Sequence, residues 1–598
     1  MLFILLFPLS IYSQTTIKID GFFDDWNGVS NTSIDDSSDS QGVDLLNFSV
    51  CNDNEYLYVK IKLAEEIDLT EQFYNPAKVM INIDADNNRF TGYSINNIGS
   101  EYGINFFDKF IFDDSDPNFV DTLSLYYLDV IPLPTYSSDE FEIAIKRSFF
   151  SDTICISINE IIGNDFMPDN GSIFTYIFNN CSTPPTSVFD FSKNDLKNLR
   201  IMTYNVWSDG LISNNRVDEH RRLLLSANAD IITYQECGNT TYNDVLGFLN
   251  TNPTYYPYIY PDLNSGNLTI SKYPSLQSWQ VANKIDAELI DLPDSIYSTD
   301  ILIINAHPPC CGNNQGRQEH FDALIQFIHD ARTVGGVIDL PINTPISFSG
   351  DMNLVGYSEQ YYTIINGTIS DTITFGSGGF PDWDNTSLDD VVPYFNEKDI
   401  AYTWDKSNPT AGDFPPGRLD FVFFTNSVMS VDKSFIISTE HMSNSLLAQN
   451  NLLWNDTKIA SDHFPIVVDF VLPMVVSGCT DPGACNYDSL AVIDNGGCFY
   501  NTFSYDTVVS TLSYYWGSYH LFSSGDYSDT AINSVGCDSI AYLNLTINNI
   551  SDVLDITDHT RNLVKITNVL GRETLYRRNT PLFYIYDDGT VEKKIVVE

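Results

Sequence analysis

Six stretches of the sequence carry acidic, amide or imidazole side chains where an apolar run ends or begins. They are residues 201–207 with Asn205, 230–236 with Glu236, 301–307 with His307, 345–353 with Asp351 and Asn353, 417–424 with Asp420, and 461–468 with Asp462 and His463. Contact with water explains one polar residue at one strand end. A cluster of carboxylates, however, repels itself unless a cation lies among them. Oxygen ligands of this kind suit Mg²⁺, Mn²⁺ or Ca²⁺, so the pattern indicates a hard divalent metal.

The apolar runs that carry these residues alternate with helical patterns between positions 199 and 472. Residues 217–228 and 317–332 show the helical spacing. Strands that alternate with helices predict an α/β domain, and this stretch is long enough to bury a layered core.

The motifs TYNVW, ITYQE, INAHP, GDMN, GRLDFVF and SDHFP, in this order, resemble those of the endonuclease/exonuclease/phosphatase superfamily. A further stretch, residues 266–274, is similar to the strand that this family has between its Glu and His motifs. The resemblance covers residues 199–472. It implies a central four-layer α/β sandwich of the DNase-like type and metal-dependent hydrolysis of phosphoesters.

The resemblance also implies roles for individual residues. Glu236 would be the principal metal ligand, with Asn205 and Asp462 near the metal, which would be Mg²⁺ or else Mn²⁺ or Ca²⁺. Asp420 would hold His463, and either this pair or Asp351 would orient or deprotonate the attacking water. Asn353 and His307 would donate hydrogen bonds to phosphate oxygens.

The segment after His307 departs from the better-known branches of the family. Arg317, in this segment, can clamp a substrate phosphate or extend into solvent from the start of a helix. Cys237 follows Glu236, and Cys310 and Cys311 follow His307, so we expect them at the catalytic rim. We predict that Cys310 or Cys311 forms a disulfide with Cys237. A bond between the two adjacent cysteines is the competing possibility, disfavoured by ring strain.

The net charge of the chain helps to distinguish between possible substrates. The chain has 30 Lys and Arg against 79 Asp and Glu, a net charge of −49. Residues 197–472 alone contain 14 Lys and Arg against 33 Asp and Glu. Because a nonspecific duplex nuclease normally needs a basic groove, a small phosphodiester or phosphomonoester is the favoured substrate and a secreted nuclease is the alternative. A third possibility is a cell-surface sugar-binding or adhesion protein with a vestigial catalytic domain.

The remaining sequence predicts an exported, multidomain chain. Residues 1–13 read as a signal peptide, and no other segment is long and apolar enough for stable membrane insertion. Residues 16–182 alternate with period two and predict an antiparallel β-sandwich, followed by a linker at 183–198. Small β modules are expected at 477–500, which is rich in cysteine, at 503–548 and at 553–598. Ten cysteines in an exported chain indicate disulfides, while their pairing and the oligomeric state are left open.

Two resemblances concern these flanking regions. Residues 17–26 and 79–92 resemble a family of β-sandwich carbohydrate-binding modules, which implies a possible glycan or Ca²⁺ ligand. The D-x-D-N-N run within 79–92 is equally a turn that needs no ion. Residues 565–594 resemble the C-terminal sorting domain of type IX secretion cargo in Bacteroidetes. That implies export through the periplasm by the type IX secretion machinery, to the cell surface or the medium.

Overall fold

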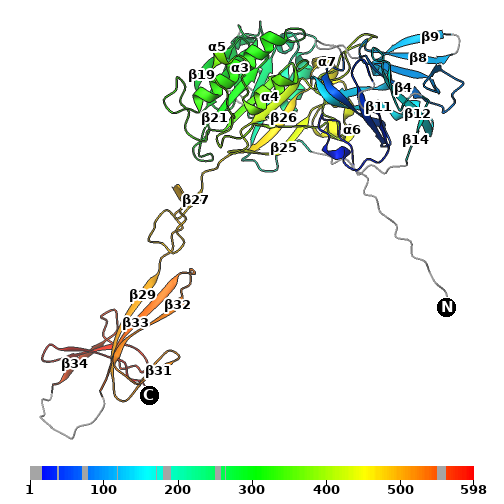
Figure 1. Cartoon of the computed structure of the whole chain (residues 1–598). Coiled ribbons are helices and arrows are strands. Elements are labelled where there is room, and N and C mark those ends of the chain that lie inside the picture. Colours follow the sequence, from blue (N-terminus) through cyan, green and yellow to red (C-terminus); the bar gives the residue numbers. More distant parts are fainter. Residues whose placement is uncertain are drawn as a thin grey trace, which may run out of the picture. The chain divides into compact units, whose positions relative to one another are not determined.

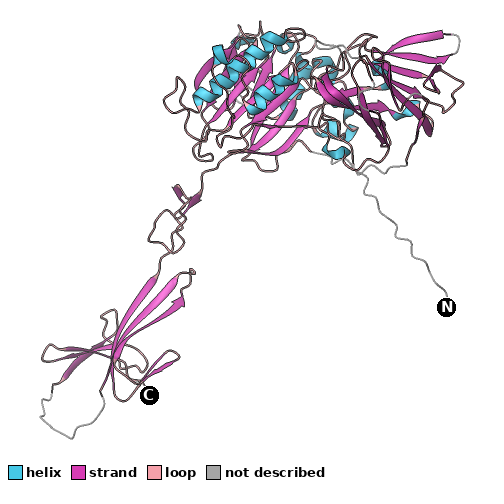
Figure 2. Ribbon diagram, viewed as in Figure 1, coloured by secondary structure: helices cyan, strands magenta, loops and turns pink. Residues whose placement is uncertain are grey.

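The computed structural model describes residues 16–36, 40–70, 78–116, 119–169, 171–179, 190–249, 258–262, 264–548 and 561–597. It divides the chain into two compact units, Met1–Val475 and Val476–Glu598. The predicted signal peptide, residues 1–13, lies outside the described residues, as do positions 183–189 of the predicted linker. Strands far outnumber helices among the described residues, which agrees with the prediction of a β-rich protein with several domains (Figures 1 and 2).

The first unit begins with two antiparallel sheets, here called the N-terminal sandwich (residues 16–179). One sheet has the order β1-β2-β3-β11-β10 and the other β13-β12-β4-β7-β8-β9, with β14 paired to β12. Alternate residues of both sheets, such as Val59, Ile143 and Ile156, point into one apolar core. The strands are β1 (Thr32–Ile34), β2 (Leu45–Asn52), β3 (Tyr56–Ile67), β4 (Val79–Asp84), β7 (Tyr102–Asn105), β8 (Phe110–Asp116), β9 (Phe119–Ser124), β10 (Ile131–Leu133), β11 (Ser138–Lys146), β12 (Thr153–Glu160), β13 (Asp165–Met167) and β14 (Phe174–Ile177), with a separate hairpin β5 (Tyr93–Ile95) and β6 (Ile98–Ser100).

Two further sheets form the α/β part of the first unit (residues 190–475). Their orders are β17-β18-β16-β15-β26-β25 and β19-β20-β21-β22-β24-β23. The central pairs β15/β16 and β21/β22 are parallel, and the other pairs are antiparallel. The strands are β15 (Leu199–Asn205), β16 (Ile231–Gln235), β17 (Tyr258–Asp262), β18 (Asn267–Ser271), β19 (Ser275–Ala282), β20 (Ile285–Ile290), β21 (Ile301–Ala306), β22 (Ile346–Asp351), β23 (Asp389–Asp390), β24 (Asp420–Phe424), β25 (Ser430–Ile436) and β26 (Ile466–Val471).

Helices cover these two sheets. Apolar residues of α1 (Val217–Ala227), α2 (Tyr242–Phe248), α6 (Asn444–Gln449) and α7 (Asp456–Ala460) pack on the sheet that contains β15. Those of α3 (Asn314–Ala331) and α4 (Ser358–Asn366) pack on the sheet that contains β22, and α5 (Thr372–Phe375) lies against α3. Helix α3 begins after Asn313, whose side chain accepts the N–H of Gly316.

The second unit consists of small sheets. It contains β27 (Ser477–Gly478), β28 (Ile493–Asp494), β29 (Thr502–Ser510), β30 (Tyr514–Trp516), β31 (Tyr519–Leu521), β32 (Gly525–Ile532), β33 (Asp538–Ile547), β34 (Leu563–Thr567), β35 (Leu582–Tyr586) and β36 (Val591–Lys594). Disulfides join Cys479 to Cys498 and Cys485 to Cys537. The second bond connects the two segments that the sequence divides into separate modules at 477–500 and 503–548. Among the described residues of the whole chain, no helix has the length and apolar character needed to cross a membrane.

Candidate active site

Strand ends of the α/β part surround one cavity of about 900 Å³. The carboxyl ends of the parallel strands β15 and β16 lie at the same edge of their sheet, since Asn205 is paired in register with Gln235. In the facing sheet, Asp351 at the end of β22 is paired with Asp420 at the start of β24. The predicted site residues that line the cavity are Glu236, His307, Asp351, Asn353, Asp462 and His463.

Asn205 joins carboxylates that come from the two sheets. Its Nδ2 donates to Glu236 Oε1 at 3.1 Å and to Asp351 Oδ2 at 2.9 Å. Its own Oδ1 accepts the N–H of Trp207 at 2.9 Å, which fixes the orientation of the amide. The structure therefore brings together three residues that are 31 to 146 positions apart in the sequence.

Glu236 lies immediately after β16 in the left-handed backbone region, with φ of 62°. Its Oε2 accepts the N–H of Ser208 at 2.7 Å. Burial alone would raise the pKa of Glu236, but the hydrogen bonds from Asn205 and Ser208 and the nearby imidazoles outweigh burial and lower it. The side chain is therefore a carboxylate at neutral pH, as a metal ligand must be.

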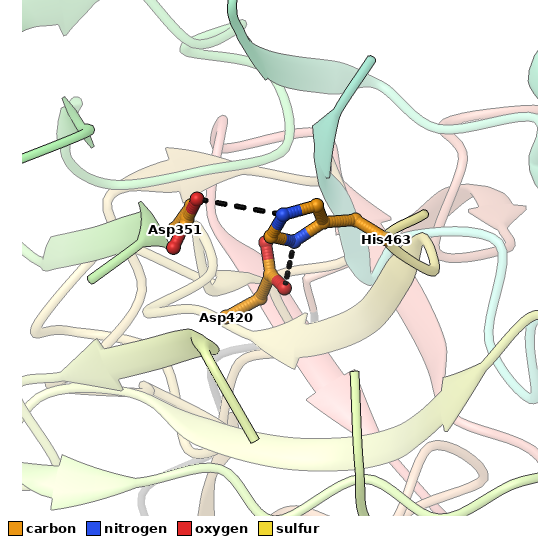
Figure 3. Close-up of side chains that lie close together, drawn as sticks. All are labelled: Asp351, Asp420 and His463. Carbon is orange, nitrogen blue, oxygen red and sulfur yellow. Dashed lines mark hydrogen bonds and ion pairs between the residues drawn. The ribbon is translucent and has the colours of Figure 1, made fainter. Parts of the chain in front are cut away.

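His463 lies between two carboxylates (Figure 3). Its Nδ1 is 2.7 Å from Asp420 Oδ2, and its Nε2 is 3.6 Å from Asp351 Oδ2. Burial would lower the pKa of His463, but Asp420 and then Asp351 outweigh burial and raise it to about 10. The imidazole is therefore a cation and a hydrogen-bond donor at neutral pH.

Asp351 lies at the centre of the polar cluster. Its Oδ2 is 3.5 Å from His307 Nε2 as well as 3.6 Å from His463 Nε2. Burial raises the pKa of Asp351, and the charge of Asp420 adds to this rise against the two imidazoles and Asn205. For His307, by contrast, burial lowers the pKa despite the nearby carboxylates.

The remaining predicted residues lie at the margin of the cluster. Asn353 Nδ2 donates to the carbonyl of Pro308 at 3.1 Å, and its backbone N–H donates to Asp351 Oδ1. Asp462 Oδ2 accepts the indole N–H of Trp404 at 3.2 Å. Asp462 and His463 follow α7 and precede β26, so the turn between these elements presents both side chains to the cavity.

The donor set fits a hard divalent cation. The carboxylates of Glu236, Asp351 and Asp462 line the same cavity, and Lys284 is the one lysine or arginine among the described residues that line it. Ligand atoms of Asp351, Asp420 and His463 also lie within 4.8 Å of one another. Because Asp420 is fully buried and binds His463 Nδ1, we describe that pair as a hydrogen-bonded dyad and assign the cation to the oxygens that face the cavity.

The structure corrects the expectation for Arg317. Its side chain is fully buried and does not line the cavity. The guanidinium donates to Gln360 Oε1 at 2.7 Å, to the carbonyl of Pro309 at 2.8 Å and to Asn314 Oδ1. These acceptors occupy its donors, so Arg317 braces the 309–314 segment and is not free to bind a phosphate.

The predicted disulfide between Cys237 and Cys310 or Cys311 is wrong for this structure, as all three cysteines carry free thiols. Cys310 and Cys311 are exposed and line the cavity. Cys237, only 1% exposed, belongs to the core under the helices instead. Glu236 and Cys237 are adjacent in sequence, but Glu236 lines the cavity whereas Cys237 packs in the apolar cluster under the helices.

Several residues that line the cavity could not be identified from the sequence. Trp207 ends the motif that contains Asn205, and its position beside a predicted ligand is a usable signal. Trp404, Lys284 and the lining residues of the N-terminal sandwich lie outside every motif. No local pattern marks them.

Comparisons with known proteins give the following similarities. No protein-family model matches the chain, and no curated protein sequence matches it. Among solved structures, TDP2 of D. rerio in complex with a single-strand DNA product is 19% identical, covers 46% of this chain and 98% of its own, and has a TM-score of 0.31. The human nocturnin catalytic domain with bound sulfate is 14% identical, with 46% and 95% covered and a TM-score of 0.30. Sphingomyelinase C of Streptomyces griseocarneus is 16% identical, with 46% and 99% covered and a TM-score of 0.28.

Proposed function

We propose that the chain is a secreted, divalent-metal-dependent phosphoesterase that hydrolyses a phosphodiester or phosphomonoester by attack of water. The observation that carries this proposal is the convergence of Glu236, Asp351 and His463 on one cavity, with Asn205 joining the first two, from strand ends far apart in the sequence. Carboxylates, an amide and imidazoles within hydrogen-bond reach of one another are the groups that phosphoryl transfer to water requires.

Glu236 and Asp462, which line the cavity, would hold the metal, with the amide of Asn205 beside them. A divalent cation bound there would neutralise the charge that develops on the phosphoryl oxygens and the leaving group. Asn205 orients Glu236 and Asp351 toward each other through its two donated hydrogen bonds. Ser208 fixes the second oxygen of Glu236.

The proton-transfer roles follow from the charge states. His463, with a pKa of about 10, already holds its proton at neutral pH and acts as a donor to a phosphate oxygen. Asp351, whose pKa burial raises, is as a carboxylate a stronger base than an ordinary aspartate, and it accepts the proton of the attacking water. His307 and Asn353 line the cavity beside Asp351 and donate to the substrate phosphate.

A nuclease remains the second candidate on the same chemistry. The acidity of the α/β part and the single lysine in the cavity lining of the described residues favour a substrate with few phosphates. Secretion is supported by the two disulfides of the second unit, which persist in oxidising compartments. Export by the type IX machinery and glycan binding by the N-terminal sandwich stay predictions.

The test is Glu236→Gln in the full chain. We expect turnover of bis(4-nitrophenyl) phosphate in the presence of MgCl₂ or MnCl₂ to fall at least about a hundredfold, because the substitution removes the charge that holds the metal. Calorimetric titration should show a matching loss of Mn²⁺ affinity at an unchanged melting temperature. Glu359→Gln, on the exposed surface of α4, is the matched control. Activity within tenfold of wild type in Glu236→Gln would refute the metal assignment.

A further inference from the structure

The α/β part does not line the candidate active site alone. Six described residues of the N-terminal sandwich also line the same cavity, from the segments that follow β3 and that contain the end of β10. They are Asp68, Leu69, Thr70, Pro132, Pro134 and Thr135. A wall of the cavity thus comes from a domain more than a hundred positions away in the sequence from Glu236 and His463.

The wall is bonded directly to the backbone that carries site residues. Thr135 Oγ1 lies 2.9 Å from the carbonyl of Leu354 and 3.0 Å from that of Arg418. Leu354 is adjacent to Asn353, and Arg418 is two positions before Asp420. Gly417 leaves room for this contact, since a Cβ at that position would lie 2.6 Å from Thr135 Cγ2.

A second set of contacts seats the 404–417 segment of the α/β part against the sandwich. The Lys109 ammonium donates to the carbonyl of Thr70 at 3.2 Å and lies 4.8 Å from the ring centroid of Phe414. The backbone carbonyl of Lys109 accepts the N–H of Gly412 at 2.9 Å. Phe414 is therefore fixed between the sandwich and the cavity that it lines.

The two domains also share one apolar core. Ile19, Trp26, Tyr58 and Leu133 of the sandwich pack in the same buried cluster as Phe395 and Tyr402 of the α/β part. Continuous burial of this kind is typical of a fixed interface and not of a module on a flexible tether. The sandwich wall consequently keeps a fixed position over the phosphate-binding residues.

The chemistry of the wall differs from that of the floor. Around the polar floor formed by Glu236 and Asp351, the lining is largely apolar and aromatic. Its members include Leu69, Pro134, Trp207, Trp404, Phe414 and Pro415. An apolar lining gains free energy by burying an apolar substituent, and Lys284 is the one lysine or arginine among the described lining residues that can pair with a phosphate of a polynucleotide.

We propose that the N-terminal sandwich is a specificity element of the active site, selecting phosphoesters whose single phosphate carries apolar substituents. The proposal rests on the proposed function and names the substrate class of that site. Leu69, a residue of the sandwich core whose 4% exposed side chain lines the cavity, contacts the apolar part of the substrate, while Thr135 positions the wall over the site.

The test measures binding without turnover. Diphenylphosphinate and dimethylphosphinate carry the same charge, cannot be hydrolysed at their P–C bonds and differ only in apolar bulk. Titrating each into the full chain with MgCl₂ by calorimetry should give at least tenfold tighter binding of diphenylphosphinate. In Leu69→Asn, which keeps the branching and the number of side-chain heavy atoms but is smaller and polar, this preference should fall below threefold while the affinity for dimethylphosphinate stays within twofold.

Thr135→Val provides an independent variant if Leu69→Asn does not fold. Valine keeps the shape but loses the donor to the backbone carbonyls, so the diphenylphosphinate preference should fall at least threefold. Ile34→Asn, at an exposed position of β1 that does not line the cavity, is the control and should keep the full preference. An unchanged preference in the folded wall variants overturns the proposal, as does tighter binding of a thymidine dinucleotide than of diphenylphosphinate.

The outcomes separate this inference from the proposed function. A wall-dependent preference without turnover of any phosphoester would refute the enzymatic proposal and leave the binding wall in place. Turnover that depends on Glu236, with no preference for apolar ligands, would refute the wall and leave the phosphoesterase in place.

Discussion

The Asp420–His463 dyad gives the sharpest prediction for the candidate site. Asp420 is fully buried, with its Oδ2 2.7 Å from His463 Nδ1. It is the largest of the carboxylate effects that raise the pKa of His463 from an ordinary 6.5 to about 10. That difference corresponds to about 5 kcal/mol in favour of the protonated imidazole at ~1.4 kcal/mol for each pH unit. We expect Asp420→Asn to remove roughly 3 kcal/mol, which lowers the pKa of His463 by about two pH units and therefore lowers kcat/KM about fiftyfold at pH 10, where the imidazole of the variant is largely neutral.

The pH profile distinguishes this role from a general loss of structure. In the wild type, His463 keeps its proton up to about pH 10, so activity should persist into the alkaline range. In Asp420→Asn, burial is opposed mainly by Asp351, so the pKa of His463 falls and the alkaline limb moves to lower pH. Protonated His463 also stabilises the fold. This stabilisation is fully present below about pH 6.5 and is lost as the pH rises through about 10.

Two measurements check the prediction. The first is kcat/KM for bis(4-nitrophenyl) phosphate between pH 6 and pH 10, and the second is an NMR titration of the His463 imidazole in EDTA. Asp244→Asn, which removes an exposed carboxylate from α2, is the control and should alter neither. A rate within threefold of wild type together with an imidazole pKa that stays near 10 would refute the reasoning.

Three further predictions concern stability, each measured by urea denaturation. Cys485→Ser removes a disulfide between residues 52 positions apart and should lower the free energy of unfolding by about 4 kcal/mol. Cys479→Ser removes a disulfide with a separation of 19 and should lower it by about 3 kcal/mol. Equal urea midpoints for the two variants would contradict this order. Burial lowers the pKa of His220 and of His441 to about 3. Each histidine should therefore reduce the free energy of unfolding by about 2 kcal/mol as the pH falls from 7 to 5, and His441→Phe should make this pH dependence less steep. Burial raises the pKa of Glu142 to about 8, so the stabilisation that its protonated form gives is lost as the pH rises from about 4.5 through 8. If the free energy of unfolding of Glu142→Gln declined equally steeply over this range, the prediction would be wrong.

Local sequence carries the information for the polar floor of the site. Asn205 and Glu236 could be placed together because the carboxyl ends of neighbouring parallel strands meet at one edge of a sheet. The same reasoning places Asp351 and His307 at the ends of β22 and β21, which are also parallel. The roles of these residues in catalysis stay predictions that the substitutions above test.

The walls of the site could not be predicted in this way. Arg317 lies near a helix start, and its position does not reveal which buried oxygens surround it. Cys237 follows Glu236 by one position, yet it packs in the apolar cluster under the helices while Glu236 lines the cavity, because the backbone turns at Glu236 after β16 has ended. Thr135 contacts carbonyls 219 and 283 positions away, and no nearby residue records such a contact.

The apolar cluster shared by the two domains also governs how the first unit unfolds. Because Ile19, Trp26 and Leu133 pack with Phe395 and Tyr402, neither domain can lose its fold without exposing the other's interior. We therefore expect residues 16–475 to melt in one cooperative transition. A fragment trimmed to residues 199–472 would present this apolar face to water and aggregate, so expression of the protein should begin upstream of Ile19.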